Sequence, residues 1–315
     1  MAGTRIGIAL GGGAARGWAH IGVLRALLEA GIAPDLIAGT SIGAVVGGCF
    51  AAGKLAELEA FARGLTRRKV FGYLDFNFAG TGLITGQRLC DRLLEHLGDR
   101  TIEDLPVPFT AVATEIGSGH EVWLSRGPMV DAIRASYALP GIFRPVRING
   151  RWLFDGALVN PIPVTVCRAM GARYVIAVNL NTDLYGRGTV LPEIAAHEVE
   201  DAPAETLAEA KGNGRSALKL LQRQLFGRGE DVPGISTVMI DAFNIVQDRI
   251  ARSRLAGDPP DAIITPRLGG IGPFDFYRAD ELIARGHAAV QRELEDLMHE
   301  LNLRSRLTPK VAVPN

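Results

Sequence analysis

The sequence AGTSIGAVVGG occupies residues 38–48 and lies within a stretch from Leu36 to Gly53 that carries no charged side chain. Its GTSIG segment matches the G-x-S-x-G pattern, in which a serine lies on a tight turn between a strand and a helix. A strand is expected at 35–38 and a helix at 42–52, because the repeated glycines favour this arrangement over a membrane span. Ser41 is therefore a candidate nucleophile.

Strands and helices alternate along the rest of the chain. Buried strands are expected at 6–10, 107–116, 173–180 and 262–265, with short strands at 121–124, 146–148 and 151–154. Helices are expected at 15–30, 128–137, 161–170 and 279–301. This order predicts an α/β fold with a mostly parallel central sheet that helices cover on both faces.

The composition argues against some classes of function. Lys and Arg together number 34, as do Asp and Glu, and no long basic run occurs, so nucleic-acid binding is not expected. The three cysteines, Cys49, Cys90 and Cys167, lie far apart and suit neither a metal site nor a disulfide framework, which indicates a reducing compartment. The N-terminal residues lack the long apolar region of a signal peptide. A cytoplasmic location is therefore expected, with peripheral contact at the inner membrane face as an additional expectation.

A glycine-rich loop, LGGGAARG at 10–17, follows the first expected strand and opens a helix. The G-x-G-x-x-G dinucleotide pattern does not fit it, and neither does the P-loop pattern, because Trp18 stands where that pattern requires lysine. Backbone N–H groups at a helix N-terminus stabilise negative charge, so beside a serine nucleophile this loop would form an oxyanion hole. Arg16 either braces the loop or contacts an anionic headgroup, and bracing is favoured.

The base that would activate Ser41 has two kinds of candidate. The first are the six histidines, His20, His96, His120, His197, His287 and His299. None of the last three follows a recognisable sheet strand, and a structural or surface role is favoured for all six. The other candidate is Asp155, which follows the expected strand 151–154 in LFDGALVNP. A carboxylate in such an apolar stretch is partly desolvated and more basic, although from the spacing alone a role in capping or turning the chain is favoured for Asp155.

Four motifs occur in a fixed order: GGGAARGWAHIGVLRAL at 11–27, GTSIG at 39–43, ALPGIFRPV at 138–146 and DGALVNPIP at 155–163. Together they resemble the bacterial patatin-like phospholipases, over about residues 5–181. The later segment LGGIGPFDFYRADELIARG is also similar to bacterial members. Four motifs in order are far more specific than G-x-S-x-G alone.

The resemblance implies a three-layer α/β/α fold and a Ser–Asp dyad, in which Ser41 is the nucleophile and Asp155 the general base. The oxyanion hole would be formed by the amides around Gly12, Gly13 and Ala14. Ala14 stands where the family pattern Gly-Gly-Gly-x-Arg-Gly has its third glycine, which leaves the donor amides open by one residue. The implied reaction is hydrolysis of fatty-acyl esters in phospholipids, lysophospholipids or neutral lipids, with no metal and no organic cofactor.

The expected domain organisation is one patatin-like domain over 5–303, with its catalytic core at about 5–182 and 258–301. A polar, helix-rich segment at about 186–256 is expected to be inserted into this core. This segment is interpreted either as a helix that caps the core or as a lid or membrane-contact element.

A basic and aromatic segment at 67–86, RRKVFGYLDFNFAGTGLITG, is a candidate for transient contact with an anionic membrane surface. Its basic and aromatic side chains are Arg67, Arg68, Lys69, Phe71, Tyr73, Phe76 and Phe78. A loop that covers the core, or a dimer contact, is an equally good interpretation, and the oligomeric state stays open.

Three alternative functions also stay open. A Ser-His-Asp esterase for small soluble esters would depend on a histidine. A regulatory or scaffolding protein with a vestigial site would have no activity. An acyltransferase would use the same acyl-enzyme, with an alcohol in place of water.

Overall fold

The computed structural model describes residues 4–73, 86–182 and 235–307 of the chain. The chain divides into two compact units, one formed by Met1–Leu184 with Gln247–Asn315 and the other by Tyr185–Val246. The first unit contains the eight-stranded sheet and both candidate catalytic residues. Most of the expected insertion lies outside the described residues, so the expected domain organisation stays a prediction.

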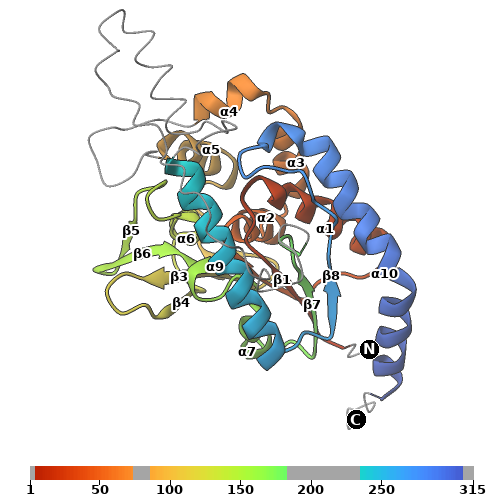
Figure 1. Cartoon of the computed structure of the whole chain (residues 1–315). Helices are drawn as coiled ribbons and strands as arrows, with labels where there is room; N and C mark the ends of the chain where they lie inside the picture. Colours follow the sequence, from red (N-terminus) through yellow and green to blue (C-terminus); the bar gives the residue numbers. More distant parts are fainter. Residues whose placement is uncertain (1–3, 74–85, 183–234, 308–315) are drawn as a thin grey trace, which may run out of the picture. The chain divides into compact units, whose positions relative to one another are not determined.

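The first unit is built on one sheet with the strand order β5-β6-β3-β2-β1-β7-β8, and β4 pairs with β3 (Figure 1). The strands are β1 (Ile6–Leu10), β2 (Leu36–Thr40), β3 (Phe109–Glu115), β4 (Glu121–Leu124), β5 (Val146–Ile148), β6 (Arg151–Asp155), β7 (Tyr174–Val178) and β8 (Ala262–Ile264). The adjacent strands β3, β2, β1, β7 and β8 run parallel to one another. Strands β4 and β6 pair antiparallel with β3, and β5 pairs antiparallel with β6. The predicted mostly parallel sheet is therefore confirmed, with an antiparallel edge.

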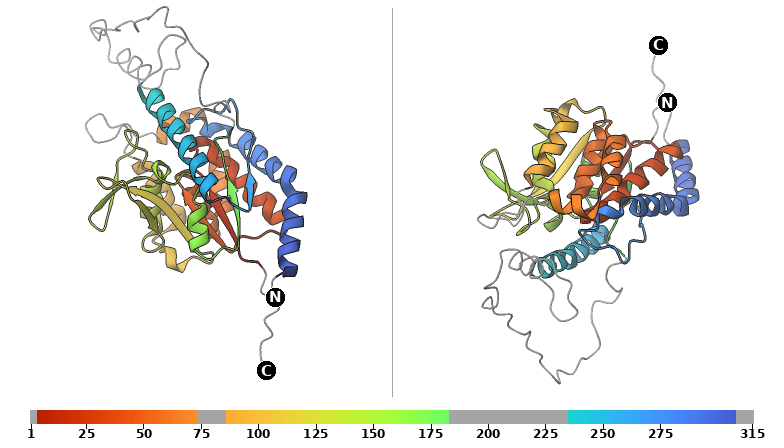
Figure 2. Two further views of the ribbon diagram at one scale, coloured as in Figure 1. Left: turned by 60° about the horizontal axis from the view of Figure 1, so that its bottom comes forward. Right: turned by 90° about the horizontal axis from the view of Figure 1, so that it is seen from above.

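Helices cover both faces of this sheet, as predicted (Figure 2). The described α-helices of the chain are α1 (Ala19–Glu29), α2 (Ile42–Ala51), α3 (Leu55–Arg63), α4 (Arg67–Tyr73), α5 (Gln87–Leu97), α6 (Met129–Tyr137), α7 (Val164–Ala169), α9 (Ile235–Gly257) and α10 (Ala279–Leu307). Ile8 and Leu10 of β1 pack into a core shared with α1, α2 and α10, whereas Ala9 packs into a second core shared with α7. Ala251, in the part of α9 that belongs to the first unit, joins this second core. The unit is thus a three-layer α/β/α fold.

Two helices begin later than the sequence predicts. The expected helix at 15–30 is divided into a 3-10 turn, Ala14–Trp18, and α1, a common form of entry into a helix. The expected helix at 161–170 begins only at Val164. Pro163 accounts for this difference, because it lacks an N–H group and disfavours helical geometry at the residue before it.

Helices α1 and α10 approach each other closely through two glycines. A Cβ atom at Gly22 would overlap the carbonyl oxygen of Ile283, and one at Gly286 would overlap that of Ala19. Only glycine permits such contact between two helix backbones. The crossing fixes α10 against the helix that follows the glycine-rich loop.

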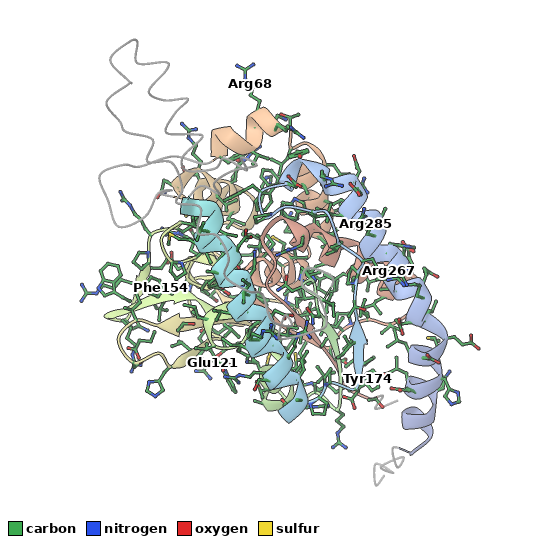
Figure 3. All side chains as sticks on the ribbon, in the orientation of Figure 1. Arg68, Glu121, Phe154, Tyr174, Arg267 and Arg285 are labelled. Atoms are coloured by element: carbon green, nitrogen blue, oxygen red, sulfur yellow. The ribbon has the colours of Figure 1, made fainter. Side chains whose placement is uncertain are left out.

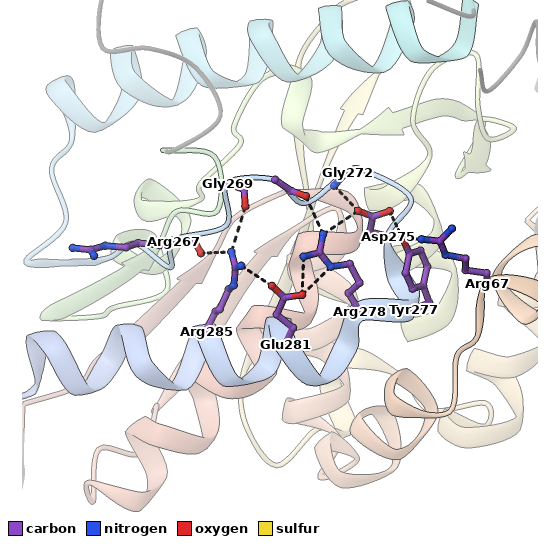
Figure 4. Close-up of polar contacts among 10 residues, drawn as sticks. Arg67, Arg267, Gly269, Gly272, Asp275, Tyr277, Arg278, Glu281 and Arg285 are labelled. Carbon is purple, nitrogen blue, oxygen red and sulfur yellow. Dashed lines mark hydrogen bonds and ion pairs between the residues drawn. The ribbon is translucent and has the colours of Figure 1, made fainter. Parts of the chain in front are cut away.

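A polar network stabilises the segment that leads into α10 (Figure 4). Glu281 accepts hydrogen bonds from Arg278 and Arg285. Asp275 accepts from the Tyr277 hydroxyl at 3.1 Å. These residues belong to the LGGIGPFDFYRADELIARG segment, which resembles bacterial family members. The hydrogen bonds show that this segment stabilises the start of α10.

Candidate active site

Ser41 lies on a sharp turn between β2 and α2, as its motif predicts. Its backbone has φ 57° and ψ −124°, in a region that residues other than glycine rarely adopt. The two flanking glycines allow the first turn of α2 to approach the strands. A Cβ atom at Gly43 would overlap the carbonyl oxygen of Leu10, and one at Gly39 would overlap that of Gly43. The turn places Ser41 at the carboxyl ends of parallel strands, where open α/β sheets bind their ligands.

Asp155 is the last residue of β6 and contacts the Ser41 side chain. Ser41 Oγ donates a hydrogen bond of 2.6 Å to Oδ2 of Asp155. The other carboxylate oxygen, Oδ1, accepts from the N–H of Ala157 at 2.8 Å. Asp155 therefore caps the turn that follows β6 and at the same time holds the Ser41 hydroxyl.

Burial determines the acidity of Asp155. Its side chain is 1% exposed. Desolvation raises the pKa of Asp155 from 3.8 to about 7, against the hydrogen bonds from Ser41 and Ala157, which lower it. A carboxyl group with this pKa exists in both protonation states near neutral pH, which suits a group that takes up and returns a proton.

In the glycine-rich loop, one of the three backbone N–H groups predicted to bind an oxyanion already has an acceptor. The N–H of Gly12 donates to the carbonyl oxygen of Pro161 at 3.0 Å, so it is not free to bind an oxyanion. In the part of the chain that the structure describes, the N–H groups of Gly13 and Ala14 have no acceptor. Of the three predicted donors, Gly13 and Ala14 keep an available N–H group among the described residues, whereas a carbonyl from beyond Asp155 occupies that of Gly12.

The buried side chains of Arg16 and His20 contact the backbone carbonyl groups of this loop. Arg16 is 1% exposed, and its Nε donates to the carbonyl oxygen of Gly13 at 3.1 Å. This geometry supports bracing and places Arg16 away from any surface headgroup. His20 Nε2 lies 2.8 Å from the carbonyl oxygen of Gly11. Burial lowers the pKa of His20 to about 4, so the ring is neutral and donates this hydrogen bond from Nε2.

The segment before α10 holds the same loop from its other end. Ala15 N–H donates to the carbonyl oxygen of Pro273 at 3.1 Å. Trp18 Nε1 donates to the carbonyl oxygen of Phe276, also at 3.1 Å. The loop is thus fixed by residues from two distant parts of the chain.

Gly12 places the glycine-rich loop next to Ser41. A Cβ atom at Gly12 would lie 3.6 Å from Cβ of Ser41 and 3.5 Å from Cβ of Ala157. It would also lie 3.2 Å from Oε1 of Gln247, a buried residue of α9. A glycine here allows the loop to pack closely against Ser41, and Gln247 contributes to this contact although no sequence motif contains it.

No described histidine takes part in this arrangement. His287 pairs with Glu29, and among the described residues no histidine hydrogen-bonds to Ser41 or Asp155. His197 lies outside the described residues. A Ser-His-Asp triad therefore has no support in the part of the chain that the structure shows.

Two buried hydroxyl groups that the sequence did not single out hold the backbone around Ser41 and Asp155. Thr40 Oγ1 donates to the carbonyl oxygen of Asn160 at 2.8 Å, which links the turn before Ser41 to the loop after Asp155. Thr114 Oγ1 donates to the carbonyl oxygen of Asp155 at 2.9 Å. In the sequence both appear only as threonines in mainly apolar strands, which does not indicate a partner.

An apolar pocket lies along the outer side of α2, between α3 and α5. Its lining includes Val45, Cys49, Leu58, Phe61 and Leu93. Val45 is one helical turn after Ser41, and Cys49 is one turn further, so both lie on the same stripe of α2. The pocket provides apolar surface close to the start of this helix.

Among the described residues, no three His, Cys, Asp or Glu side chains gather as ligands for a metal ion. None of the described helices is both long enough and apolar enough to span a bilayer.

The patatin-like phospholipase family model matches residues 8–168, a segment that contains the glycine-rich loop, Ser41 and Asp155. The chain belongs to this family. The predicted family is thereby confirmed, together with the three-layer fold. Patatin-like phospholipases hydrolyse lipid esters, so the protein is a lipid acyl hydrolase in the general sense.

Relatives extend the match beyond that segment. An NTE family protein of Mycobacterium tuberculosis is 35% identical over 329 residues, which cover 92% of this chain and 91% of that protein. The patatin-like phospholipase domain-containing protein 7 of Mus musculus is 35% identical over 61% of this patatin-like chain and 15% of its own length. Among solved structures, VipD from Legionella pneumophila is similar with a TM-score of 0.45 and 13% identity, over 93% of this chain and 67% of that one.

Proposed function

We propose that the protein hydrolyses fatty-acyl esters of phospholipids or lysophospholipids, with Ser41 as the nucleophile and Asp155 as the general base. The observation that carries this proposal is the 2.6 Å hydrogen bond from Ser41 Oγ to the buried carboxylate of Asp155. A serine hydroxyl becomes an effective nucleophile only when a neighbouring base takes its proton, and Asp155 is the acceptor in place.

The acylation step follows from this geometry. Oδ2 of Asp155 takes the proton of Ser41 while Oγ bonds to the acyl carbon, and the carbonyl oxygen becomes an oxyanion. The free N–H groups of Gly13 and Ala14 stabilise that charge, and the N-terminus of α2 adds to the field. The ester C–O bond then breaks, the leaving alcohol takes the proton from Asp155, and an acyl-enzyme remains.

Deacylation repeats the same steps with water. Asp155 accepts a proton from the attacking water molecule, which bonds to the acyl carbon. The second tetrahedral intermediate expels Ser41 Oγ, which recovers its proton from Asp155. Fatty acid is released, and the dyad returns to its starting state.

The test of this proposal is fatty-acid release from mixed phospholipid and lysophospholipid vesicles as a function of pH. Asp155 accepts a proton only when it is ionised, so kcat/KM should rise with pH through about 7 and then level off. A rate that stays constant between about pH 5 and pH 8 would contradict a base with a raised pKa.

The same assay separates the alternative functions. Activity on short soluble esters alone would favour a small-ester esterase. Transfer of the acyl group to an added alcohol would favour an acyltransferase. No turnover of any ester by the folded protein would favour a regulatory role.

Contact with an anionic membrane surface is part of the proposal and rests on the segment 67–86. Arg68 on α4 is exposed and points away from the body of the protein (Figure 3). Arg67 is engaged within the fold, because its guanidinium lies 4.5 Å from the ring centre of Tyr277 and donates to the hydroxyl of that residue. Residues 74–85, which include Phe76 and Phe78, lie outside the described residues.

Arg68→Glu is expected to weaken binding to anionic vesicles by about tenfold or more, since each basic residue near such a surface contributes about 1 kcal/mol and the substitution reverses the charge. Vesicle co-sedimentation at low and high salt measures this effect. Arg126→Glu, which makes the same charge change on the loop after β4, is the control. Binding that does not respond to salt would contradict the electrostatic contact.

A further inference from the structure

The hydroxyl of Ser136 connects the nucleophile to the strand that carries its partner. Ser136 lies on α6 and is fully buried. Its Oγ accepts the backbone N–H of Ser41 at 2.9 Å and donates to the carbonyl oxygen of Val112 at 2.6 Å. One side chain therefore joins the turn after β2 to the middle of β3.

The base is fixed against the same point of β3. Asp155 on β6 pairs with Ala113, the residue next to Val112. Gly156 follows Asp155, and a Cβ atom there would overlap the carbonyl oxygen of Val112. This carbonyl oxygen thus accepts the hydrogen bond of Ser136 on one side and packs against the backbone after Asp155 on the other.

The contact also explains how Ser41 keeps an uncommon backbone conformation. A serine with φ 57° is held in place only if its surroundings determine it. The Ser41 N–H points at Ser136 Oγ, so it does not serve as an oxyanion donor. The donors proposed above, the N–H groups of Gly13 and Ala14, lie in the glycine-rich loop and have no acceptor among the described residues.

We propose that Ser136 is a positioning residue that sets the Ser41 hydroxyl at hydrogen-bonding distance from Asp155. The inference rests on the proposed dyad and adds to it a residue that contacts neither the substrate nor the reacting atoms. It predicts that loss of the Ser136 hydroxyl impairs the chemical step and leaves substrate binding unchanged.

A merely structural role makes a different prediction. If Ser136 only fills space and satisfies two backbone groups, its removal lowers the thermal stability without changing the pH dependence of the reaction. A positioning role links Ser136 to the acidity of Asp155, because the hydrogen bond from Ser41 lowers the pKa of that carboxyl. A looser bond therefore moves the acid limb of the rate profile to higher pH.

The experiment compares wild type, Ser136→Ala and Ser136→Cys for ester hydrolysis and for the rate at which a small fluorophosphonate labels Ser41, each across pH. Ser136→Ala should lower kcat and the labelling rate by about 10- to 100-fold, with KM changed by less than about twofold and the acid limb shifted upward. Ser136→Cys keeps the size of the side chain with a weaker donor and acceptor, so its rate should lie in between. Ile133→Val, one turn earlier on the same buried face of α6, is the control for a small packing defect and should retain the wild-type profile.

The outcomes separate this inference from the proposed function. If wild type is active and Ser41→Ala is not, but folded Ser136→Ala keeps its kcat and its pH profile, the positioning role is wrong and the dyad stands. An equal loss in Ile133→Val would also overturn the positioning role. If Ser41→Ala remains active, the proposed function itself fails. Should Ser136→Ala not fold, Ser136→Cys decides by the same criteria.

Discussion

Replacing Ser41 with alanine or Asp155 with asparagine is expected to lower fatty-acid release by about 10³-fold or more, because each change removes a group without which the acyl-enzyme cannot form. Ser41→Ala removes the atom that bonds to the acyl carbon. Asp155→Asn keeps the shape of the side chain and its contact with Ala157, but an amide cannot accept the proton of Ser41. Release of labelled fatty acid from vesicles, with folding checked by circular dichroism, measures both losses.

Matched substitutions elsewhere serve as controls. Ser118→Ala, on the hairpin between β3 and β4, and Asp131→Asn, on the half-exposed side of α6, make the same chemical changes away from the site. Both should retain activity to within about twofold, as surface substitutions usually do. Full activity in Asp155→Asn would rule out this residue as the base and direct attention to a histidine.

The same Asp155→Asn substitution is expected to stabilise the protein at alkaline pH. Folding raises the pKa of Asp155 from 3.8 to about 7, so the folded state prefers the neutral carboxyl. Wild-type stability should therefore fall as the pH rises from about 4 to about 7, and change little from this group above that. The asparagine is neutral throughout and escapes this loss, which amounts to about 4 kcal/mol at about 1.4 kcal/mol for each pKa unit.

Urea unfolding at several pH values measures this effect. The free energy of unfolding of Asp155→Asn should exceed that of wild type at pH 8 and approach it near pH 4. Asp131→Asn again serves as the control and should follow the wild-type curve. Two parallel curves for Asp155→Asn and wild type would show that burial does not raise the pKa of Asp155.

The fold and the turn that carries Ser41 were predictable from the sequence for local reasons. The strand, turn and helix around Ser41 follow from one apolar stretch broken by glycines, and the glycines are required where α2 meets the strands. Asp155 stands at the end of a short strand in an apolar context, but this local signal did not separate a base from a turn cap, and the role of base was implied by the family resemblance.

The rest of the site depends on contacts between distant residues, which leave no local pattern. The free amides of the glycine-rich loop could not be assigned, because the acceptor that occupies Gly12 comes from Pro161. The role of Ser136 cannot be recognised from its helix alone, because its two hydrogen-bond partners lie on β3 and on the turn after β2. Gln247 lies beside Gly12 from a helix outside the four motifs.

The support of the glycine-rich loop by the segment before α10 has a consequence for the order of folding. Trp18 and its acceptor Phe276 are 258 positions apart in the sequence, and Ala15 depends on Pro273 in the same way. Contacts of such separation form late, because the entropy of closing a long chain opposes them until the rest of the core is present. During synthesis the motifs around Ser41 and Asp155 leave the ribosome long before these supports do. The nascent chain thus contains Ser41 and Asp155 early, and the glycine-rich loop gains these two supports only after Pro273 and Phe276 have been synthesised.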